Sequence, residues 1–171
     1  MKRLTILRHA KSSWDDRSLD DFDRPLNERG WKAARRMGRE ISKRGMKFDF
    51  VLASTAARVR QTIDGLGEDY RLEAPIRFEP RIYMARASEL LELVAAIPQE
   101  AESALLVGHN TAVERLVIKL SSDDEEGLRA RVQEKFPTAA LAAIELPIER
   151  WNDVEPNIGQ VVELIFPKEL D

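Results

Sequence analysis

The chain has 171 residues, a length typical of one domain, and we expect residues 1–171 to form a single domain. Its 27 Lys and Arg against 30 Asp and Glu give a formal net charge of −3, which argues against nucleic-acid binding. Because cysteine is absent, disulfides, thiolate nucleophiles, zinc–cysteine sites and iron–sulfur clusters are excluded. Imidazole chemistry therefore depends on two histidines, His9 and His109.

Neither an export signal nor a membrane-spanning segment is visible. The apolar stretch behind the basic start of the chain, Leu4–Leu7, is too short for a signal peptide. The longest apolar run, Ala139–Ile144, is far below the roughly 20 residues that a transmembrane helix needs. We therefore expect a cytoplasmic protein that does not interact with membranes.

The first half of the chain begins with a short apolar run, Leu4–Leu7, which predicts a buried strand. The polar stretch after it contains five aspartates between Asp15 and Asp23 and predicts a solvated loop. Asn27 can cap a helix that Gly45 ends, and its apolar face comprises Trp31, Ala34, Gly38 and Ile41.

Strand and helix signals continue to alternate after this helix. Asp49–Ala53 predicts a second buried strand, residues 55 to about 65 predict a helix, and Ile76–Phe78 predicts a weak third strand. Ser88 can cap the next helix, whose apolar face comprises Leu90, Leu91, Val94 and Ile97, with Pro98 just beyond it.

The last part of the chain supplies three more strands. Ala104–Val107 predicts a fourth strand, and Asn110–Leu120 predicts a helix whose apolar residues recur at helical spacing on one face. The highly charged segment Asp123–Lys135 predicts a surface helix or an excursion. Ala140–Leu146 and Val161–Phe166 predict the final two strands.

This alternation predicts an α/β fold, a three-layer sandwich with a mainly parallel central sheet flanked by helices. In such folds a ligand sits beyond the carboxyl ends of the strands, where the helices begin. Helices that start near Thr55 and Asn110 would point backbone N–H groups and positive dipole ends at that edge.

Both histidines follow predicted strands. His9 comes with Arg8 after the first strand, His109 follows the fourth, and Arg58 lies shortly after the second. Any of them alone has a more common explanation, because a lone histidine is more often a packing residue and a lone arginine more often a surface residue. Together, two arginines, two helix N-termini and two histidines predict a pocket for a dianion such as phosphate.

Three segments resemble signatures of the histidine phosphatase superfamily. Leu7–Ser12 resembles its Arg-His-Gly signature, and Asp23–Leu26 with Gly30 resembles the segment that follows. Ser54–Thr62 resembles the second signature and Leu106–Asn110 the third. The resemblance extends from residue 4 to about residue 146 and is strongest to the SixA-type phosphohistidine phosphatases. It implies a phosphoglycerate-mutase-like α/β sandwich.

The resemblance implies that His9 is the nucleophile and becomes phosphorylated, while Arg8, Arg58 and His109 hold the phosphoryl group. Water would then hydrolyse the phosphohistidine, without a metal or other cofactor. Three further side chains could also contact the phosphate. Asn110 could donate to an oxygen or cap a helix, and Ser12 and Ser54 could also donate. Lys11 is either part of the positive field or solvated, and Trp14 either lines the pocket rim or is buried.

Larger relatives supply a general acid from a segment between the second and third signatures, where this chain has Glu79. Without such an acid an alkoxide leaves less readily than an imidazole, which can be protonated before it departs. We therefore expect a phosphohistidine of a protein as the substrate. The alternatives are a phosphomonoesterase or mutase acting on a small phosphorylated metabolite, and a non-catalytic module that binds phosphorylated ligands.

Overall fold

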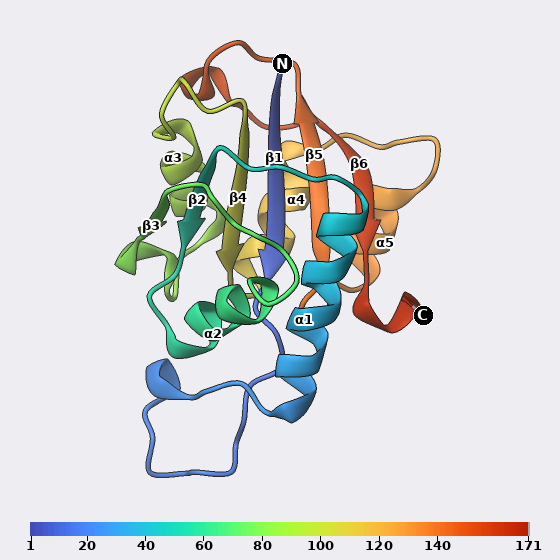
Figure 1. Ribbon diagram of the computed structural model, residues 1–171. Coiled ribbons are helices and arrows are strands. Elements are labelled where there is room, and N and C mark those ends of the chain that lie inside the picture. Colours follow the sequence, from blue (N-terminus) through green and yellow to red (C-terminus); the bar gives the residue numbers. More distant parts are fainter. Residues whose placement is uncertain (171) are drawn as a thin grey trace.

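The computed structural model describes residues 1–170 and contains a six-stranded sheet in the order β3-β2-β4-β1-β5-β6 (Figure 1). β1 (Lys2–Arg8), β2 (Phe50–Ala53), β3 (Ile76–Phe78) and β4 (Ser103–Gly108) pair in parallel. β5 (Leu141–Leu146) and β6 (Gln160–Ile165) extend the sheet in antiparallel fashion. The sheet is thus mixed, and the predicted α/β architecture is confirmed.

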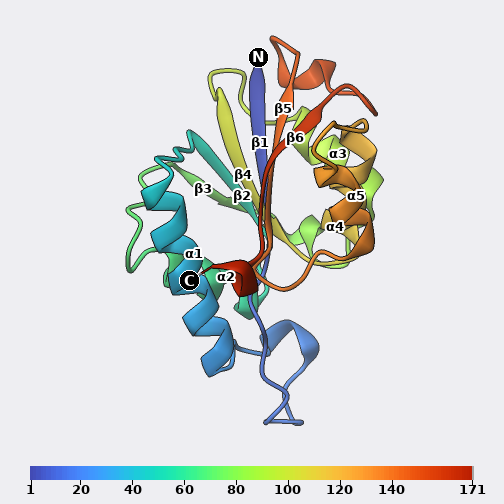
Figure 2. The same cartoon turned by 90° about the vertical axis from the view of Figure 1, so that its right-hand side faces the viewer.

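Helices cover both faces of the sheet (Figure 2). α1 (Glu28–Lys43) and α2 (Ala57–Leu66) pack on one face. α3 (Ala87–Ala95), α4 (Ala112–Leu120) and α5 (Leu128–Glu134) pack on the other. Neighbouring strand residues point to opposite faces, so Leu106 joins the core under α4 while Val107 joins the core under α1 and α2.

Local signals at the ends of α1 act as the sequence predicts. The Asn27 side chain accepts a hydrogen bond from the Gly30 backbone N–H at 2.8 Å, as an N-cap does. Gly45 adopts a left-handed φ of 66° just after the helix, a conformation that costs glycine little. Gly30 has a different requirement, because a Cβ there would lie 2.1 Å from the Lys11 carbonyl oxygen.

Three predicted helix starts are wrong by about two residues. The N-cap of α3 is Arg86 instead of Ser88, and the Glu89 carboxylate accepts from the Arg86 backbone N–H at 3.1 Å. α2 and α4 begin at Ala57 and Ala112, two residues after the predicted starts; Ala56 is extended, and residues 110–111 form a turn before α4. The charged segment 123–135 contains α5, whose Val132 is buried against the core.

Strand direction places the carboxyl ends of β1, β2 and β4 at one edge of the sheet. The loop of residues 11–24 extends beyond this edge (Figure 1). Among residues 1–170 no helix is long and apolar enough to cross a membrane.

Candidate active site

The carboxyl ends of three adjacent parallel strands bring the predicted site residues together. His9 follows β1, Ser54 follows β2 and His109 follows β4. The His9 and His109 rings lie with centroids 5.2 Å apart and planes at 54°. Both imidazoles are almost fully buried, with exposed fractions of 7% and 9%.

His9 is held in one tautomer by the backbone. Its Nδ1 lies 2.7 Å from the Ala10 carbonyl oxygen, which can only accept, so Nδ1 carries the proton. Nε2 is then the unprotonated nitrogen with a free lone pair. Burial lowers the pKa of His9 from 6.5 to about 3, with smaller contributions from His109, Arg58 and Arg8. His9 is therefore a neutral, oriented base or nucleophile at pH 7.

Thr62 fixes the backbone behind His9. Its hydroxyl accepts from the Ala10 N–H at 2.9 Å and donates to the Arg58 carbonyl oxygen at 2.7 Å. One fully buried side chain thus joins the segment after β1 to the first turn of α2. We did not predict this residue, although Thr62 is four residues after Arg58 and so lies on the same side of the helix.

His109 has one partner and one unpaired ring nitrogen. Its Nε2 lies 2.8 Å from the Ser54 Oγ, which also accepts from the Ala56 backbone N–H at 3.2 Å. Its Nδ1 is buried without a hydrogen-bond partner in the described chain. Burial, then the charge of Arg58, lowers the pKa of His109 to about 4. Ser54, which could donate to phosphate, contacts the second histidine in this structure.

Arg8 and Asn110 share the Phe136 carbonyl oxygen. The Arg8 Nη1 donates to it at 3.1 Å, and the Asn110 Nδ2 donates at 2.9 Å. The prediction that Asn110 caps a helix is wrong, because α4 begins at Ala112. Burial is the main cause of a lowered pKa of Arg8. The Arg8 Nε is buried with no partner among residues 1–170.

Arg58 is paired with an aspartate from the acidic loop. Its Nη2 lies 3.0 Å from the Asp21 Oδ2, and its Nη1 donates to the Asp21 carbonyl oxygen at 2.7 Å. The Tyr83 hydroxyl donates to the same carboxylate oxygen at 2.7 Å, and the Tyr83 ring stands edge-on to His109 at 5.5 Å. The loop is therefore not simply solvated, since Asp21 reaches the site.

Arg24 holds this loop in place by hydrogen bonds within it. Its guanidinium donates to the Ser12 Oγ and to the Asp21 Oδ1, the latter at 3.1 Å. Ser12, which could donate to phosphate, accepts from Arg24 here and helps to position that side chain. Trp14 is 72% exposed with the Arg24 guanidinium 3.3 Å from its ring centroid, so the alternative of a buried tryptophan is wrong.

Two other predicted residues lie outside the cluster. Glu79 accepts from the Arg81 backbone N–H at 3.1 Å and caps the short 3-10 helix η2 (Pro80–Ile82). No hydrogen bond or ion pair joins its carboxylate to the histidines or arginines in the described residues, so its candidacy as the general acid has no geometric support. Lys11 is exposed and lines a neighbouring hollow.

Comparison with known proteins identifies the family of this chain. The family model of the histidine phosphatase superfamily (branch 1) matches residues 4–83. An uncharacterized protein of Mycobacterium tuberculosis is 34% identical over 164 residues, which cover 95% of this chain and all of the relative. A crystal structure of a candidate SixA phosphohistidine phosphatase from Agrobacterium tumefaciens superposes with a TM-score of 0.82 at 31% identity, covering 97% of this chain and 98% of that one. The chain belongs to the histidine phosphatase superfamily.

Within this superfamily the structural likeness is to the SixA branch. A structure of the protein histidine phosphatase SixA complexed with tungstate has a TM-score of 0.80 at 23% identity and covers 99% of each chain. The shared fold is the phosphoglycerate-mutase-like α/β sandwich. The protein is thus a histidine phosphatase with a SixA-like fold.

The arrangement in this histidine phosphatase suits an anion with several oxygens. Four buried side-chain polar atoms lack partners in residues 1–170, and two of them, the Arg8 Nε and the His109 Nδ1, are nitrogens at the sheet edge that can donate to an anion. Unpaired buried donors are costly, so these two nitrogens indicate a ligand with acceptor oxygens. Among the same residues, no three His, Asp or Glu side chains form a group that could hold a metal ion.

Proposed function

We propose that this protein is a metal-independent phosphatase that forms a phosphohistidine on His9 and acts on phosphohistidine in a protein. One observation carries the proposal. The 2.7 Å contact between the His9 Nδ1 and the Ala10 carbonyl oxygen leaves Nε2 with a free lone pair inside a cationic pocket. A site that only bound phosphate would need cationic donors there, whereas this nitrogen is an acceptor and repels an anion.

The His9 Nε2 attacks phosphorus, the bond from phosphorus to the leaving group breaks, and phospho-His9 forms. Arg8, Arg58 and His109 stabilise the equatorial oxygens, because phosphoryl transfer depends mainly on positioning and on charge stabilisation. His109 is neutral before the substrate arrives, and a bound dianion favours its protonated form. Water then attacks phospho-His9, which releases inorganic phosphate and restores the imidazole.

The protonation state of the site supports an imidazole leaving group. The carboxylate that reaches the cluster, Asp21, has a lowered pKa because Tyr83 and then Arg58 hydrogen-bond to it. An ionised carboxylate has no proton to give to an alkoxide. An imidazole can instead be protonated on its other ring nitrogen before the P–N bond breaks, so it needs no acid from the enzyme.

The proposal is tested by comparing kcat/KM for a phosphohistidine protein and for a sugar monophosphate. We expect the phosphohistidine protein to be preferred by at least about a hundredfold, and the His9→Ala variant to be inactive on both while it retains the wild-type fold. A clear preference for the sugar phosphate would contradict the substrate and favour a small-molecule phosphomonoesterase. Full activity of the variant would contradict the mechanism.

A further inference from the structure

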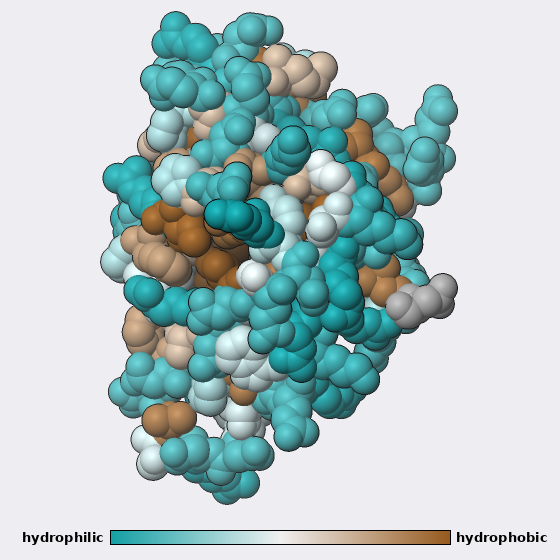
Figure 3. Space-filling view, viewed as in Figure 1, coloured by the Kyte–Doolittle hydropathy of each residue, from teal (hydrophilic) through white to brown (hydrophobic). Residues whose placement is uncertain are grey.

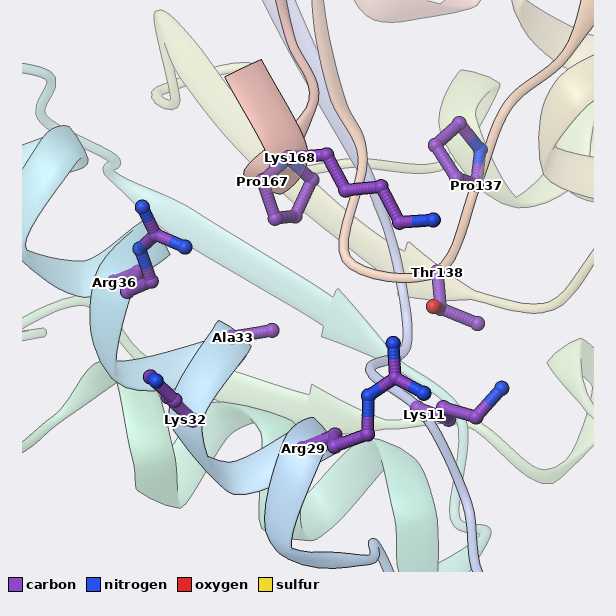
Figure 4. Close-up of a pocket in the computed structure, with 9 residues that line it drawn as sticks. All are labelled: Lys11, Arg29, Lys32, Ala33, Arg36, Pro137, Thr138, Pro167 and Lys168. Carbon is purple, nitrogen blue, oxygen red and sulfur yellow. The ribbon is translucent and has the colours of Figure 1, made fainter. Parts of the chain in front are cut away.

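A second cationic site lies beside the catalytic pocket. A hollow of about 280 Å³ lies between α1, the Pro137–Thr138 loop and the 3-10 helix η4 (Pro167–Glu169) (Figure 4). Its lining contains five basic residues and no acidic one, and the basic residues are Lys11, Arg29, Lys32, Arg36 and Lys168. Arg29 extends from α1 toward Thr138, with Lys168 facing it from η4 (Figure 4). We call this hollow the basic pocket.

The charges of the basic pocket are not neutralised within the described chain. No Asp or Glu among residues 1–170 forms an ion pair with any of the five basic residues, whereas other basic residues of α1 such as Arg35 and Arg39 have carboxylate partners. Arg36 is oriented by donating to the Leu170 carbonyl oxygen. Such a concentration of positive charge is unusual on a chain with a net charge of −3, and it attracts anions.

The basic pocket lies beside the segment that carries His9. Lys11 is two residues after His9, so their Cα atoms lie at most about 7 Å apart. The Lys11 carbonyl oxygen accepts from the Asn27 N–H at 3.0 Å, which attaches the start of α1 to this segment. On the opposite wall, the Ala139 N–H donates to the His9 carbonyl oxygen at 3.0 Å. The backbone at Lys11, which lines the basic pocket, is therefore within about 7 Å of the backbone at His9.

We propose that the basic pocket binds an acidic segment of the substrate protein, next to its phosphorylated histidine. The inference rests on the proposed function and adds a specificity determinant to it. Glu or Asp carboxylates would pair with Arg29, Lys32 and Lys168, while the phosphoryl group enters the pocket of His9 and His109. These residues need not take part in catalysis.

The construction of the basic pocket favours a flexible acidic segment over a small anion. Lys11, Arg29, Lys32 and Lys168 are exposed, and the surface over α1 is hydrophilic (Figure 3). Exposed pairs contribute little individually, so binding requires several carboxylates at once. Three of the four uncharged residues that line the pocket, Ala33, Pro137 and Pro167, offer apolar contact to the stems of Glu side chains.

A matched pair of double variants tests the site. Arg29→Glu with Lys32→Glu reverses two charges in the basic pocket. Arg39→Glu with Lys43→Glu makes the same chemical changes on exposed positions of the same helix, about 16 Å further along its axis. Two unphosphorylated peptides of equal length, one with a run of Glu and one with Gln in its place, are titrated by fluorescence anisotropy.

We expect the Glu peptide to bind the wild type and the Arg39/Lys43 variant within about twofold of each other. Binding to the Arg29/Lys32 variant should be at least about tenfold weaker, and the Gln peptide should bind poorly throughout. Equal binding of the Glu peptide to all three proteins, or no binding to any, would overturn the inference. Binding of inorganic pyrophosphate to the pocket without binding of the peptide would overturn it in favour of a small-anion site.

Phosphohistidine versions of the two peptides separate this inference from the proposed function. We expect the wild type to show about tenfold higher kcat/KM for the Glu version, and the Arg29/Lys32 variant to lose that preference. Hydrolysis of both versions at equal rates would contradict the basic pocket and leave the proposed function intact. Failure to hydrolyse either version, with Glu-peptide binding preserved, would contradict the proposed function and leave the basic pocket intact.

Discussion

The guanidinium of Arg58 is bound twice by Asp21, through the side-chain oxygen at 3.0 Å and through the backbone carbonyl oxygen at 2.7 Å. Arg58 is almost buried, whereas Asp21 is about half exposed on the loop before α1. The carboxylate uses the same planar donors that an arginine offers to a phosphoryl group. A bound phosphate therefore competes with Asp21 for Arg58.

Removing the charge of Asp21 should strengthen phosphate binding. We expect Asp21→Asn to lower the Ki of inorganic phosphate by about two- to fivefold, because the competing pair is partly exposed and so contributes modestly. Asp23→Asn is the control, since Asp23 is an exposed carboxylate of the same loop without an ion pair in the described chain. A higher Ki in Asp21→Asn would show that Asp21 mainly positions Arg58.

Ser54 should matter for turnover through His109. Ser54→Ala removes the hydroxyl 2.8 Å from the His109 Nε2, and we expect kcat to fall about tenfold because the imidazole loses its orientation. Ser121→Ala is a matched control, since Ser121 is equally buried and its hydroxyl donates to the Val117 carbonyl oxygen in α4. Steady-state kinetics should show loss in the first variant alone, and equal kcat in both would contradict this role.

Two buried threonines should respond oppositely to replacement by valine. Thr62→Val leaves the buried Ala10 N–H without an acceptor, so we expect a loss of about 1–3 kcal/mol in the free energy of unfolding, together with reduced activity. Thr5 is equally buried, but its hydroxyl has no partner among residues 1–170. Thr5→Val should therefore be neutral or stabilising in urea denaturation. Equal losses in the two variants would contradict the assignment of Thr62.

The two histidines should make the protein less stable in mild acid. In the folded protein, burial lowers the pKa of His9 from 6.5 to about 3 and that of His109 to about 4, so the unfolded chain binds protons that the folded chain does not. The stability from their neutral forms is complete above pH 6.5 and decreases as the pH falls toward 4. Between pH 7.5 and 5.5 we expect a loss of up to about 1.4 kcal/mol for each imidazole.

A variant that lacks both imidazoles provides the control for this pH dependence. His9→Gln with His109→Gln should lose less stability over the same range when urea unfolding is measured at both pH values. Carboxylates titrate mainly below this range and so affect both proteins little. Parallel pH profiles for the wild type and the double variant would contradict the lowered pKa values.

The sequence was sufficient to predict features that depend on local pattern. The alternation of strands and helices predicted the sheet, and parallel strands necessarily bring the residues after their carboxyl ends, such as His9 and His109, to one edge. No sequence pattern predicts the contacts that the loop of residues 11–24 makes with residues far away in the chain. Asp21 was one of five aspartates in an apparently solvated stretch, and its pairing with Arg58 and Tyr83 depends on the path of the loop across the site.

The same limit applies to the hydroxyl groups. Ser12 and Ser54, which lie in the segments that resemble the first and second signatures, were predicted as possible phosphate donors. In the structure their oxygens contact Arg24 and His109, so they support the side chains beside them. A sequence shows which polar groups are near the site, but the direction in which each points is decided by the tertiary structure.

The central claim, that His9 carries the phosphoryl group, is tested most directly by trapping the intermediate. The enzyme is mixed with a phosphorylated substrate, quenched within milliseconds in alkaline denaturant that preserves phosphohistidine, and mapped by peptide mass spectrometry. We predict one phosphoryl group, on the peptide that contains His9, and none in His9→Ala. Turnover without phosphorylation of His9, or phosphate on His109 instead, would contradict the account.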